Sequence, residues 1–314
     1  MIWKKIKQKF LNFTLFLLSL LAKFLVIFRN LFGYIIGKIL FSSKYANLYF
    51  KNFYSELVII RKLRFQDIYI DVKINSFWDY WRIFEFEKYS VEELFSDISE
   101  NRNNKPVIYY EIGANVGYSA LLIAKKIEDK GHVYAVEAEP TNYKTLCDNI
   151  ILNKLKNITP INIGINNNSK VGRLYYNQYH TKMHKTLPVS GMGAHSIVLN
   201  DDLHNKKIFA ELLFMNFDDL IKNFNLKIPT HIYVDAHGSE TSVIESMKFS
   251  LANSNLEKIL IDIEEDDVLN IEKTKIYEIL LKEGFKLKKN DFIKSQSVVG
   301  NSHKAVFVKP TVKN

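Results

Sequence analysis

Along residues 106–314, short apolar runs alternate with stretches in which apolar positions recur every three or four residues. The short runs are typical of buried strands, and the longer stretches are typical of helices with one apolar face. Strands that alternate with helices in this way form parallel sheets with crossover helices. We therefore expect an α/β domain with an open, mostly parallel, twisted sheet and helices on both faces. Its expected strands are 107–111, 132–137 and 158–163, and its expected helices are 118–127 and 142–153.

The pattern of residues 10–41 is different, because apolar side chains cover almost the whole surface of a helix. At about 100° per residue the polar positions fall on one narrow stripe. These positions are Asn12, Ser19, Lys23, Asn30 and Gly37. A helix of this kind lies in the headgroup region of a membrane, and lysines near its start bind anionic lipid. We expect residues 1–41 to hold a cytoplasmic protein at the inner face of a membrane.

Three other interpretations of this segment stay open. Residues 10–28 are about long enough to cross a bilayer. Lys23 would then lie inside the hydrocarbon, at a cost of about 2.5–3.5 kcal/mol. The segment is equally suited to pack on the protein itself or on a second subunit. A cleaved signal peptide is disfavoured, because no small-residue cleavage site follows the apolar stretch.

Residues 42–105 are rich in aromatic side chains and contain strand-like runs over 57–72. Ser90, with a glutamate three residues later, is typical of a helix start. We interpret the region as a cap folded onto the α/β domain. Most of its aromatic residues suit a core, while Trp78 and Trp81 are candidates for substrate contacts.

The net charge of +9 is unevenly distributed. Residues 1–50 contain eight basic residues and no acidic residue, which leaves 35 basic and 34 acidic residues in the rest of the chain. The α/β domain therefore lacks the positive field that nucleic-acid binding needs, and we expect no nucleic-acid partner. The only cysteine is Cys147, which excludes a disulfide within the chain and fits a reducing compartment.

A glycine turn, Glu111-Ile-Gly-Ala-Asn-Val-Gly117, lies between the first expected strand and the first expected helix. Glycines at such a turn let a ligand approach the backbone, and the following helix offers free N–H groups. Glu137 closes the next expected strand, 24 residues after Gly113, where a carboxylate can accept both hydroxyls of a ribose. Without a ligand, the same residues form a tight strand-to-helix turn and a surface glutamate.

The spacing of the turn distinguishes between adenosine-containing cofactors. Nicotinamide dinucleotides are bound by G-x-G-x-x-G, whereas this turn has G-x-x-x-G with Asn115 at the place of the middle glycine. The acid directly before the turn suits a cationic amino or sulfonium group. We therefore expect S-adenosylmethionine, with an NAD-dependent oxidoreductase as the less favoured alternative. The expected cofactor-binding residues are Glu111, Gly113, Asn115, Gly117 and Glu137.

With these motifs the sequence resembles the FkbM-type methyltransferases over about residues 106–310. The shared elements are residues 110–118, 133–140, 152–159, 217–220 and 232–240. The resemblance implies a Rossmann-like class I methyltransferase domain that transfers a methyl group to oxygen, often a hydroxyl of a sugar. The family pattern I-D-V-E-G-x-E stands here as Val234-Asp-Ala-His-Gly-Ser-Glu240, so a histidine replaces the middle acid.

Methyl transfer to a hydroxyl needs an aligned nucleophile, a base and the exclusion of water. Asp235 and His237 follow an expected central strand, at the edge where open α/β sheets bind ligands. Both are candidate bases, and the resemblance favours Asp235. His195 and Ser196, in an expected insertion over the site, are candidate substrate contacts, as is Glu240. We expect no functional metal ion.

The sequence thus predicts an S-adenosylmethionine-dependent O-methyltransferase. Its expected acceptor is a hydroxyl of a sugar in a glycan or a lipid-linked saccharide, or of another small molecule. The alternative from a different class is a membrane-associated scaffold that keeps the methyltransferase fold without turnover.

Overall fold

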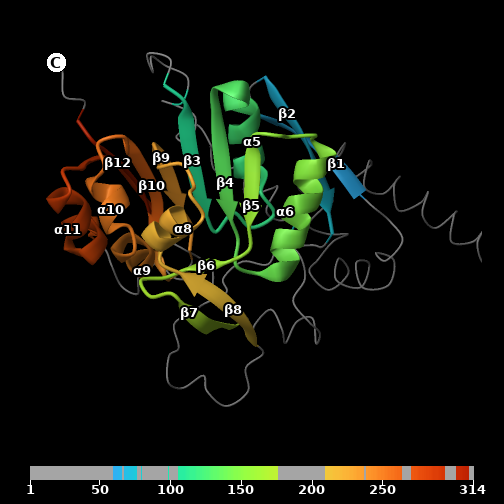
Figure 1. The fold of residues 1–314 in the computed structure, drawn as a ribbon. Helices are drawn as coiled ribbons and strands as arrows, with labels where there is room; N and C mark the ends of the chain where they lie inside the picture. The colour runs from blue at the N-terminus through green and yellow to red at the C-terminus, as the bar shows by residue number, and fades with distance from the viewer. Residues whose placement is uncertain are drawn as a thin grey trace, which may run out of the picture. The chain divides into compact units, whose positions relative to one another are not determined.

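The computed structural model describes residues 59–65, 67–75, 79, 98, 105–175, 209–236, 238–263, 270–293 and 302–310. Residues Ile60–Asn314 form one compact unit, which Figure 1 shows as a ribbon. Several predictions fall outside the described residues, namely the segment 1–41, the helix expected at Ser90, and Trp78 and Trp81. Within the described ranges, no helix is both long and apolar enough to cross a membrane.

The unit is built on a seven-stranded sheet with the strand order β11-β12-β10-β9-β3-β4-β5. The five strands from β10 to β5 run parallel, whereas β12 runs antiparallel to both β10 and β11. This confirms the expected open, mostly parallel sheet. Its strands are β3 (Val107–Ile112), β4 (Gly131–Val136), β5 (Ile158–Ile161), β9 (His231–Val234), β10 (Lys258–Ile263), β11 (Lys286–Ile293) and β12 (Ser302–Val308).

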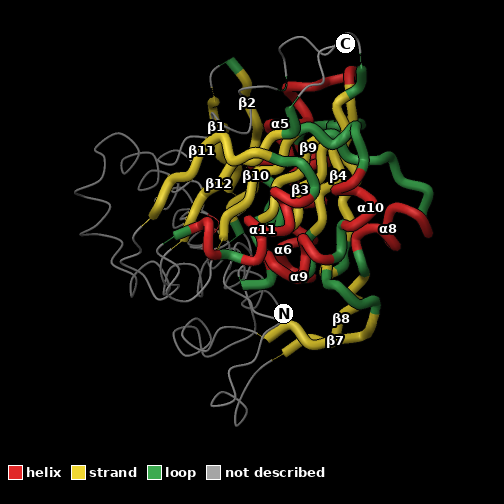
Figure 2. Tube along the Cα trace, turned by 90° about the vertical axis from the view of Figure 1, so that its left-hand side faces the viewer, coloured by secondary structure: helices red, strands yellow, loops and turns green. Residues whose placement is uncertain are grey.

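Different helices cover the two faces of this sheet (Figures 1 and 2). One face carries α5 (Tyr118–Ile127) and α6 (Pro140–Leu152), both close to their predicted bounds. An apolar core cluster lies on the other face, where alternate residues of β3, β9 and β10 meet the helices of the second half of the chain. These helices are α8 (Phe217–Asn223), α9 (Glu240–Glu245), α10 (Lys248–Ala252) and α11 (Lys275–Lys282), and 3-10 turns span Glu128–Lys130 and Ile271–Lys273.

Side-chain caps set where several of these helices begin. The Glu139 carboxylate accepts a hydrogen bond from the backbone N–H of Asn142, and Pro140 lies in the first turn of α6. Asn216 caps α8 in the same way, and Thr274 caps α11. Each cap satisfies backbone N–H groups that have no partner within the helix. The capping residues of the sequence therefore fix where these helices begin.

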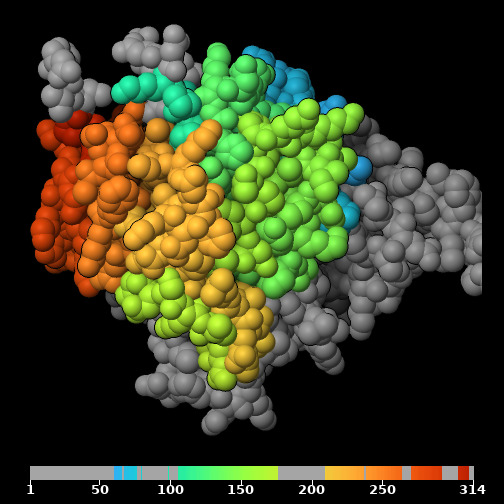
Figure 3. Space-filling model, viewed as in Figure 1, coloured from blue at the N-terminus to red at the C-terminus, as the bar shows by residue number. Residues whose placement is uncertain are grey.

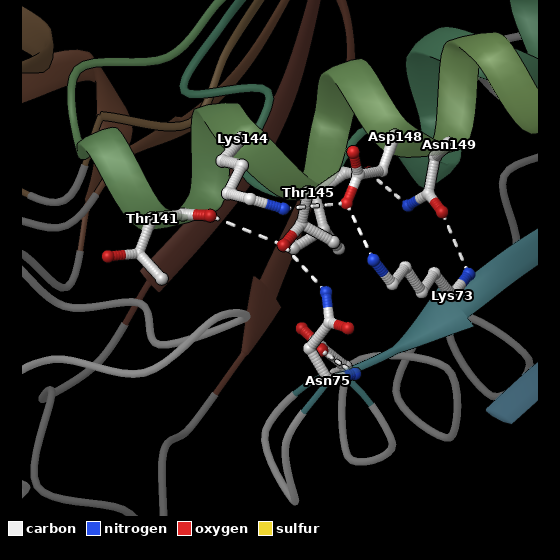
Figure 4. A network of polar contacts seen from close by, with 9 residues as sticks. Lys73, Asn75, Thr141, Lys144, Thr145, Asp148 and Asn149 are labelled. Atoms are coloured by element: carbon white, nitrogen blue, oxygen red, sulfur yellow. Dashed lines mark hydrogen bonds and ion pairs between the residues drawn. The ribbon is translucent and has the colours of Figure 1, made fainter. Parts of the chain in front are cut away.

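An amino-terminal hairpin packs against α5 and α6. It consists of β1 (Ile59–Phe65) and β2 (Ile68–Ile74), within the region where strand-like runs predict extended structure. On β2, the backbone N–H of Lys73 donates to Asn149 Oδ1 at 2.7 Å, and Lys73 Nζ binds Asp148 Oδ2 at 2.7 Å. Beyond the strand, Asn75 Nδ2 donates to Thr145 Oγ1 at 2.9 Å (Figure 4). Polar side chains of α6 thus hold the hairpin in place.

A second, three-stranded sheet follows β5 and has the order β6-β8-β7. It is formed by β6 (Gly164–Ile165), β7 (Lys170–Tyr175) and β8 (Phe209–Met215). Figure 3 shows its strands β7 and β8 projecting from the lower side of the molecule. The candidate substrate contacts His195 and Ser196 lie between β7 and β8, outside the described residues.

Candidate active site

The order in which the strands are added changes direction at β3. From β3 the chain continues to β4 and β5 on one side of the sheet, and it later adds β9 and β10 on the other side. Open α/β sheets bind their ligands at the carboxyl ends of the strands next to such a switch point. Three predicted segments meet there: the turn after β3, Glu137 after β4 and Asp235 after β9.

Close backbone packing explains the first glycine of the turn. Gly113 has a φ of +86°, and a Cβ atom at this position would stand 1.9 Å from the carbonyl oxygen of Asp235. The N–H groups of Gly113 and Ala114 both donate to the carbonyl oxygen of Val136, at 3.0 and 2.9 Å. Only glycine fits a site that combines a positive φ with contact to another backbone. The turn therefore joins the ends of β3, β4 and β9.

The other two predicted residues of the turn also adopt positive φ values. Gly117 has a φ of +88°, and its missing side chain leaves room for Leu146 and Leu121. Asn115 has a φ of +52°, a conformation that asparagine tolerates better than most residues. Its side-chain oxygen accepts a hydrogen bond from the Val116 N–H at 2.9 Å.

The carboxylate of Glu137 faces the turn. Its Oε2 accepts a hydrogen bond from the Asn115 N–H at 2.7 Å, and its Oε1 accepts one from the Glu139 N–H at 2.8 Å. Burial raises the pKa of Glu137 to about 7, although these two hydrogen bonds act in the opposite direction. The Asn142 side chain also hydrogen-bonds this carboxylate, which leaves about one of its four lone pairs for a further donor, such as a hydroxyl.

Glu111 is a deeply buried acid of the site, with 2% of its surface exposed. Its Oε1 accepts a hydrogen bond from the hydroxyl of Ser119, whereas its Oε2 has no hydrogen-bond partner within the described part of the chain. Burial, together with the charges of Asp235 and Glu137, raises the pKa of Glu111 to about 8, although the hydrogen bond from Ser119 acts in the opposite direction. A buried polar atom without a partner is rare in a folded protein and calls for an explanation.

The segment after β9 contains both candidate bases. Asp235 donates its backbone N–H to the carbonyl oxygen of Ile112 at 2.9 Å, which fixes it beside the end of β3. His237 lies outside the described residues. Glu240, a candidate substrate contact, is buried, and both of its carboxylate oxygens accept the Gly238 N–H at 3.0 Å. The structure thus places the Glu240 carboxylate on the backbone of its own turn.

Sequence reasoning missed several residues that support the site. Asn149 donates to the carbonyl oxygen of Val116 at 2.9 Å, and Asn162 donates to that of Glu137 at 2.8 Å. Ser119 supplies the hydroxyl that binds Glu111. An asparagine inside a helix or just after a strand is only a weak sequence indication of a residue that supports a site, because most such residues face solvent. Among the described residues, no group of three or more metal-ligating side chains is arranged to hold a metal ion.

The strand order, the antiparallel β12 and the glycine turn at the switch point define a methyltransferase of the Rossmann-like class. Residues 111–294, more than half of the chain, match the methyltransferase FkbM domain. The chain belongs to this family. This confirms the prediction of a methyltransferase that uses S-adenosylmethionine, while the roles of the individual site residues stay predictions.

One curated relative is a tRNA(Phe) (4-demethylwyosine(37)-C(7)) aminocarboxypropyltransferase from Methanocaldococcus jannaschii. It is 42% identical over 59 residues, which make up 19% of this chain. The match spans only 23% of the length of that protein.

Similar solved structures include an FkbM methyltransferase from Methylobacillus flagellatus, with a TM-score of 0.41 and 15% identity. That match covers 68% of this chain and 47% of the other, about half of its length. Another is fibrillarin from Aeropyrum pernix in complex with S-adenosylmethionine. Its TM-score is 0.41 at 14% identity, over 79% of this chain and 82% of the other.

Proposed function

We propose that the protein transfers the methyl group of S-adenosylmethionine to a hydroxyl oxygen of a sugar, in a glycan or a lipid-linked saccharide. The observation that carries the cofactor site is the buried Oε2 of Glu111, which lacks a partner directly before the glycine turn. A cationic ligand at this point would supply the missing interaction and favour the ionised carboxylate.

The residues around the switch point fit the parts of this cofactor. Glu111 would bind its cationic amino-acid end, and Glu137, which already touches the turn through Asn115, would accept the ribose hydroxyls. Gly113 and Gly117 keep side chains away from the turn. When bound, the cofactor supplies an electrophilic methyl group on a sulfonium.

The remaining task of the protein is to align the acceptor hydroxyl and to remove its proton. A base of this chain would accept the hydroxyl proton as the acceptor oxygen takes up the methyl group. Asp235 is the favoured base, because its backbone is fixed between the ends of β9 and β3. His237 is the alternative.

The charge of the site favours a neutral acceptor over a nucleic acid. The carboxyls of Glu111, Glu137, Asp235 and Asp262 lie close enough to influence one another's ionisation. These carboxyls offer a polyphosphate no positive charge, and residues 51–314 carry no net positive field to attract it. The curated relative acts on tRNA, so an RNA acceptor belongs in the test.

Residues 1–41 complete this proposal. An apolar, basic segment at the inner face of a membrane would bring the enzyme to lipid-linked saccharides. Flotation with anionic liposomes tests this part. We expect the full chain to float and a chain lacking residues 1–41 to stay in solution, and equal behaviour of the two would contradict it.

Two measurements test the function. Isothermal calorimetry should show binding of S-adenosylmethionine, weakened at least tenfold in Glu137→Ala, and no binding at millimolar ligand would refute the proposal. The purified protein should be incubated with methyl-labelled S-adenosylmethionine and with saccharide, lipid or RNA fractions of cells that lack the gene. We expect the label to appear in the saccharide or lipid fraction. Label in RNA would overturn the acceptor, and binding without transfer to any fraction would favour the scaffold.

A further inference from the structure

The sheet face opposite the apolar core carries a row of polar residues across three neighbouring strands and β12. Glu111 on β3 pairs with Tyr233 on β9, and Tyr233 pairs with Leu260 on β10. Asp262 follows Leu260 by two residues, so it points to the same face, and it pairs with Lys304 on β12. The row starts at the proposed cofactor carboxylate and runs away from β4.

Asp262 is the centre of this row. Its Oδ2 accepts a hydrogen bond from the hydroxyl of Tyr233 at 3.2 Å and forms an ion pair with Lys304 Nζ at 3.4 Å. Its Oδ1 is shielded from water and has no hydrogen-bond partner among the described residues. A buried acceptor without a donor is destabilising, so this oxygen is suited to meet a donor from a ligand.

A second unpartnered group lies on the same face. The Tyr109 hydroxyl is buried, with 2% of the residue exposed, and it also lacks a partner in the described part of the chain. Burial raises the pKa of Tyr109, and the charge of Glu111 raises it further, so the two side chains are close. Three buried oxygen atoms without partners, on Tyr109, Glu111 and Asp262, therefore share one face of β3 and β10, with β9 between these two strands.

This row is next to the proposed base. Val234, the residue before Asp235, pairs with Ile261, the residue before Asp262. Asp235 follows β9, which lies between β10 with Asp262 and β3 with Glu111, and its charge acts on both of these carboxyls. A ligand group bound by Asp262 would thus lie on the far side of Asp235 from the cofactor carboxylate.

We propose that Asp262, Tyr233 and Lys304 form an acceptor-binding subsite, in which Asp262 Oδ1 and Lys304 Nζ bind a hydroxyl that is not methylated. The subsite rests on the proposed function, because it orients the acceptor of that reaction. The acceptor class that fits this subsite is a neutral polyol.

The pairing of charges selects this class. Asp262 and Lys304 neutralise each other, so the subsite offers an acceptor oxygen and an ammonium donor without net charge. A hydroxyl donates and accepts at once and matches both groups. A cationic ligand would compete with Lys304, and an anionic ligand would be repelled by the Asp262 carboxylate. The side chains of Asp262 and Lys304 are 22% and 24% exposed, so a ligand can reach the ion pair, and the shielded Oδ1 of Asp262 must turn toward it on binding.

The test uses the full chain in detergent and neutral methyl glycosides of glucose, galactose and mannose as probes. Saturation-transfer NMR titrations should detect binding of at least one glycoside to the wild type. We expect Asp262→Asn and Lys304→Gln to weaken it by about tenfold or more, the loss of a hydrogen bond to a charged group. Thermal unfolding checks that each variant folds. If Asp262→Asn does not fold, Lys304→Gln alone tests the subsite.

Asp291→Asn is the matched control. Asp291 lies opposite Lys304 on β11, forms an ion pair with Lys289 at 2.8 Å and is half exposed. Asp291→Asn therefore removes the same charge as Asp262→Asn but affects no buried oxygen. It should bind the glycosides as the wild type does. Absence of glycoside binding to the wild type, or equal binding by Asp262→Asn, would overturn the subsite.

Calorimetry with S-adenosylmethionine on the same samples separates the two proposals. Asp262→Asn should bind this ligand within about twofold of the wild type, and a larger loss would assign the residue to the cofactor site and overturn the subsite. A wild type that binds glycosides but no S-adenosylmethionine would refute the proposed function and leave the subsite standing as a saccharide-binding site.

Discussion

The backbone of Gly113 lies directly against the carbonyl group of Asp235, so that a methyl group at residue 113 would fall 1.9 Å from its oxygen. This contact joins the cofactor turn after β3 to the segment that carries the favoured base after β9. The positive φ of Gly113 adds a second constraint. No rearrangement of a flexible side chain can relieve a clash between a Cβ atom and another backbone.

Gly113→Ala should therefore displace the ends of β3 and β9 and abolish measurable binding of S-adenosylmethionine. We expect the free energy of unfolding to fall by about 2–4 kcal/mol, because the strain of a positive φ adds to the clash. Denaturant unfolding and calorimetry measure the two effects. Gly284→Ala is the control, since Gly284 also has a positive φ but no neighbour within 4 Å. It should lose about 1–2 kcal/mol and bind normally, and a normal affinity in Gly113→Ala would contradict the close-contact account.

The buried carboxyl of Glu111 makes stability depend on pH. Its pKa rises from about 4.5 to about 8 in the folded protein, so the folded chain keeps a proton that the unfolded chain has released between these values. Stability then decreases as pH rises through this window. In Glu111→Gln the free energy of unfolding should therefore fall less steeply between pH 5 and about 8. A residual slope should come from Glu137, whose pKa is raised to about 7.

Denaturant unfolding at a series of pH values checks this prediction. The exposed Glu272→Gln is the control and should keep the wild-type profile. An unchanged slope in Glu111→Gln would show that the carboxyl is not buried in a protonated form.

Asn149 couples the hairpin to the cofactor turn. It accepts the Lys73 N–H at 2.7 Å and donates to the Val116 carbonyl at 2.9 Å. Asn149→Ala leaves both buried groups without a partner, so it should lower the free energy of unfolding by about 2–4 kcal/mol. The affinity for S-adenosylmethionine should fall as well, because Val116 belongs to the turn.

Asn153→Ala is the matched comparison. Asn153 exchanges hydrogen bonds with the backbone of Asp71 at 2.9 and 2.6 Å, and within the described part of the chain no hydrogen bond joins its side chain to the turn. We expect a loss of stability with an unchanged affinity for S-adenosylmethionine. If the two variants weaken binding equally, the bond to Val116 has no special role in positioning the turn.

Asp235→Asn tests the assignment of the base. Loss of a positioned general base lowers the rate by about 10²–10⁴-fold. We expect kcat to fall within this range while the affinity for S-adenosylmethionine changes little, as measured by single-turnover transfer and calorimetry. The exposed Asp219→Asn, on α8, should behave as the wild type. A greater loss of kcat in His237→Gln than in Asp235→Asn would move the role to the histidine.

The local features of the fold could be predicted from the sequence. The strands and helices from 107 to 161 lie close to their predicted bounds, because hydrophobic periodicity reports which face of an element is buried. The turn at Gly113 and the acid at Glu137 follow from the same pattern, since a turn and a strand end are set by neighbouring residues. Residues 1–41, His195, Ser196 and His237 are predictions that the described residues do not test.

The sequence by itself therefore determined the rhythm of strands and helices, the glycine turn and the acids at the strand ends, all of which depend on short-range spacing. Only the tertiary structure decided that Glu111 keeps a buried oxygen without a partner and that Tyr233, Asp262 and Lys304 meet. These contacts join strands that are distant in the chain. Burial and hydrogen-bond satisfaction arise only when the strand order is complete, so no local pattern contains them.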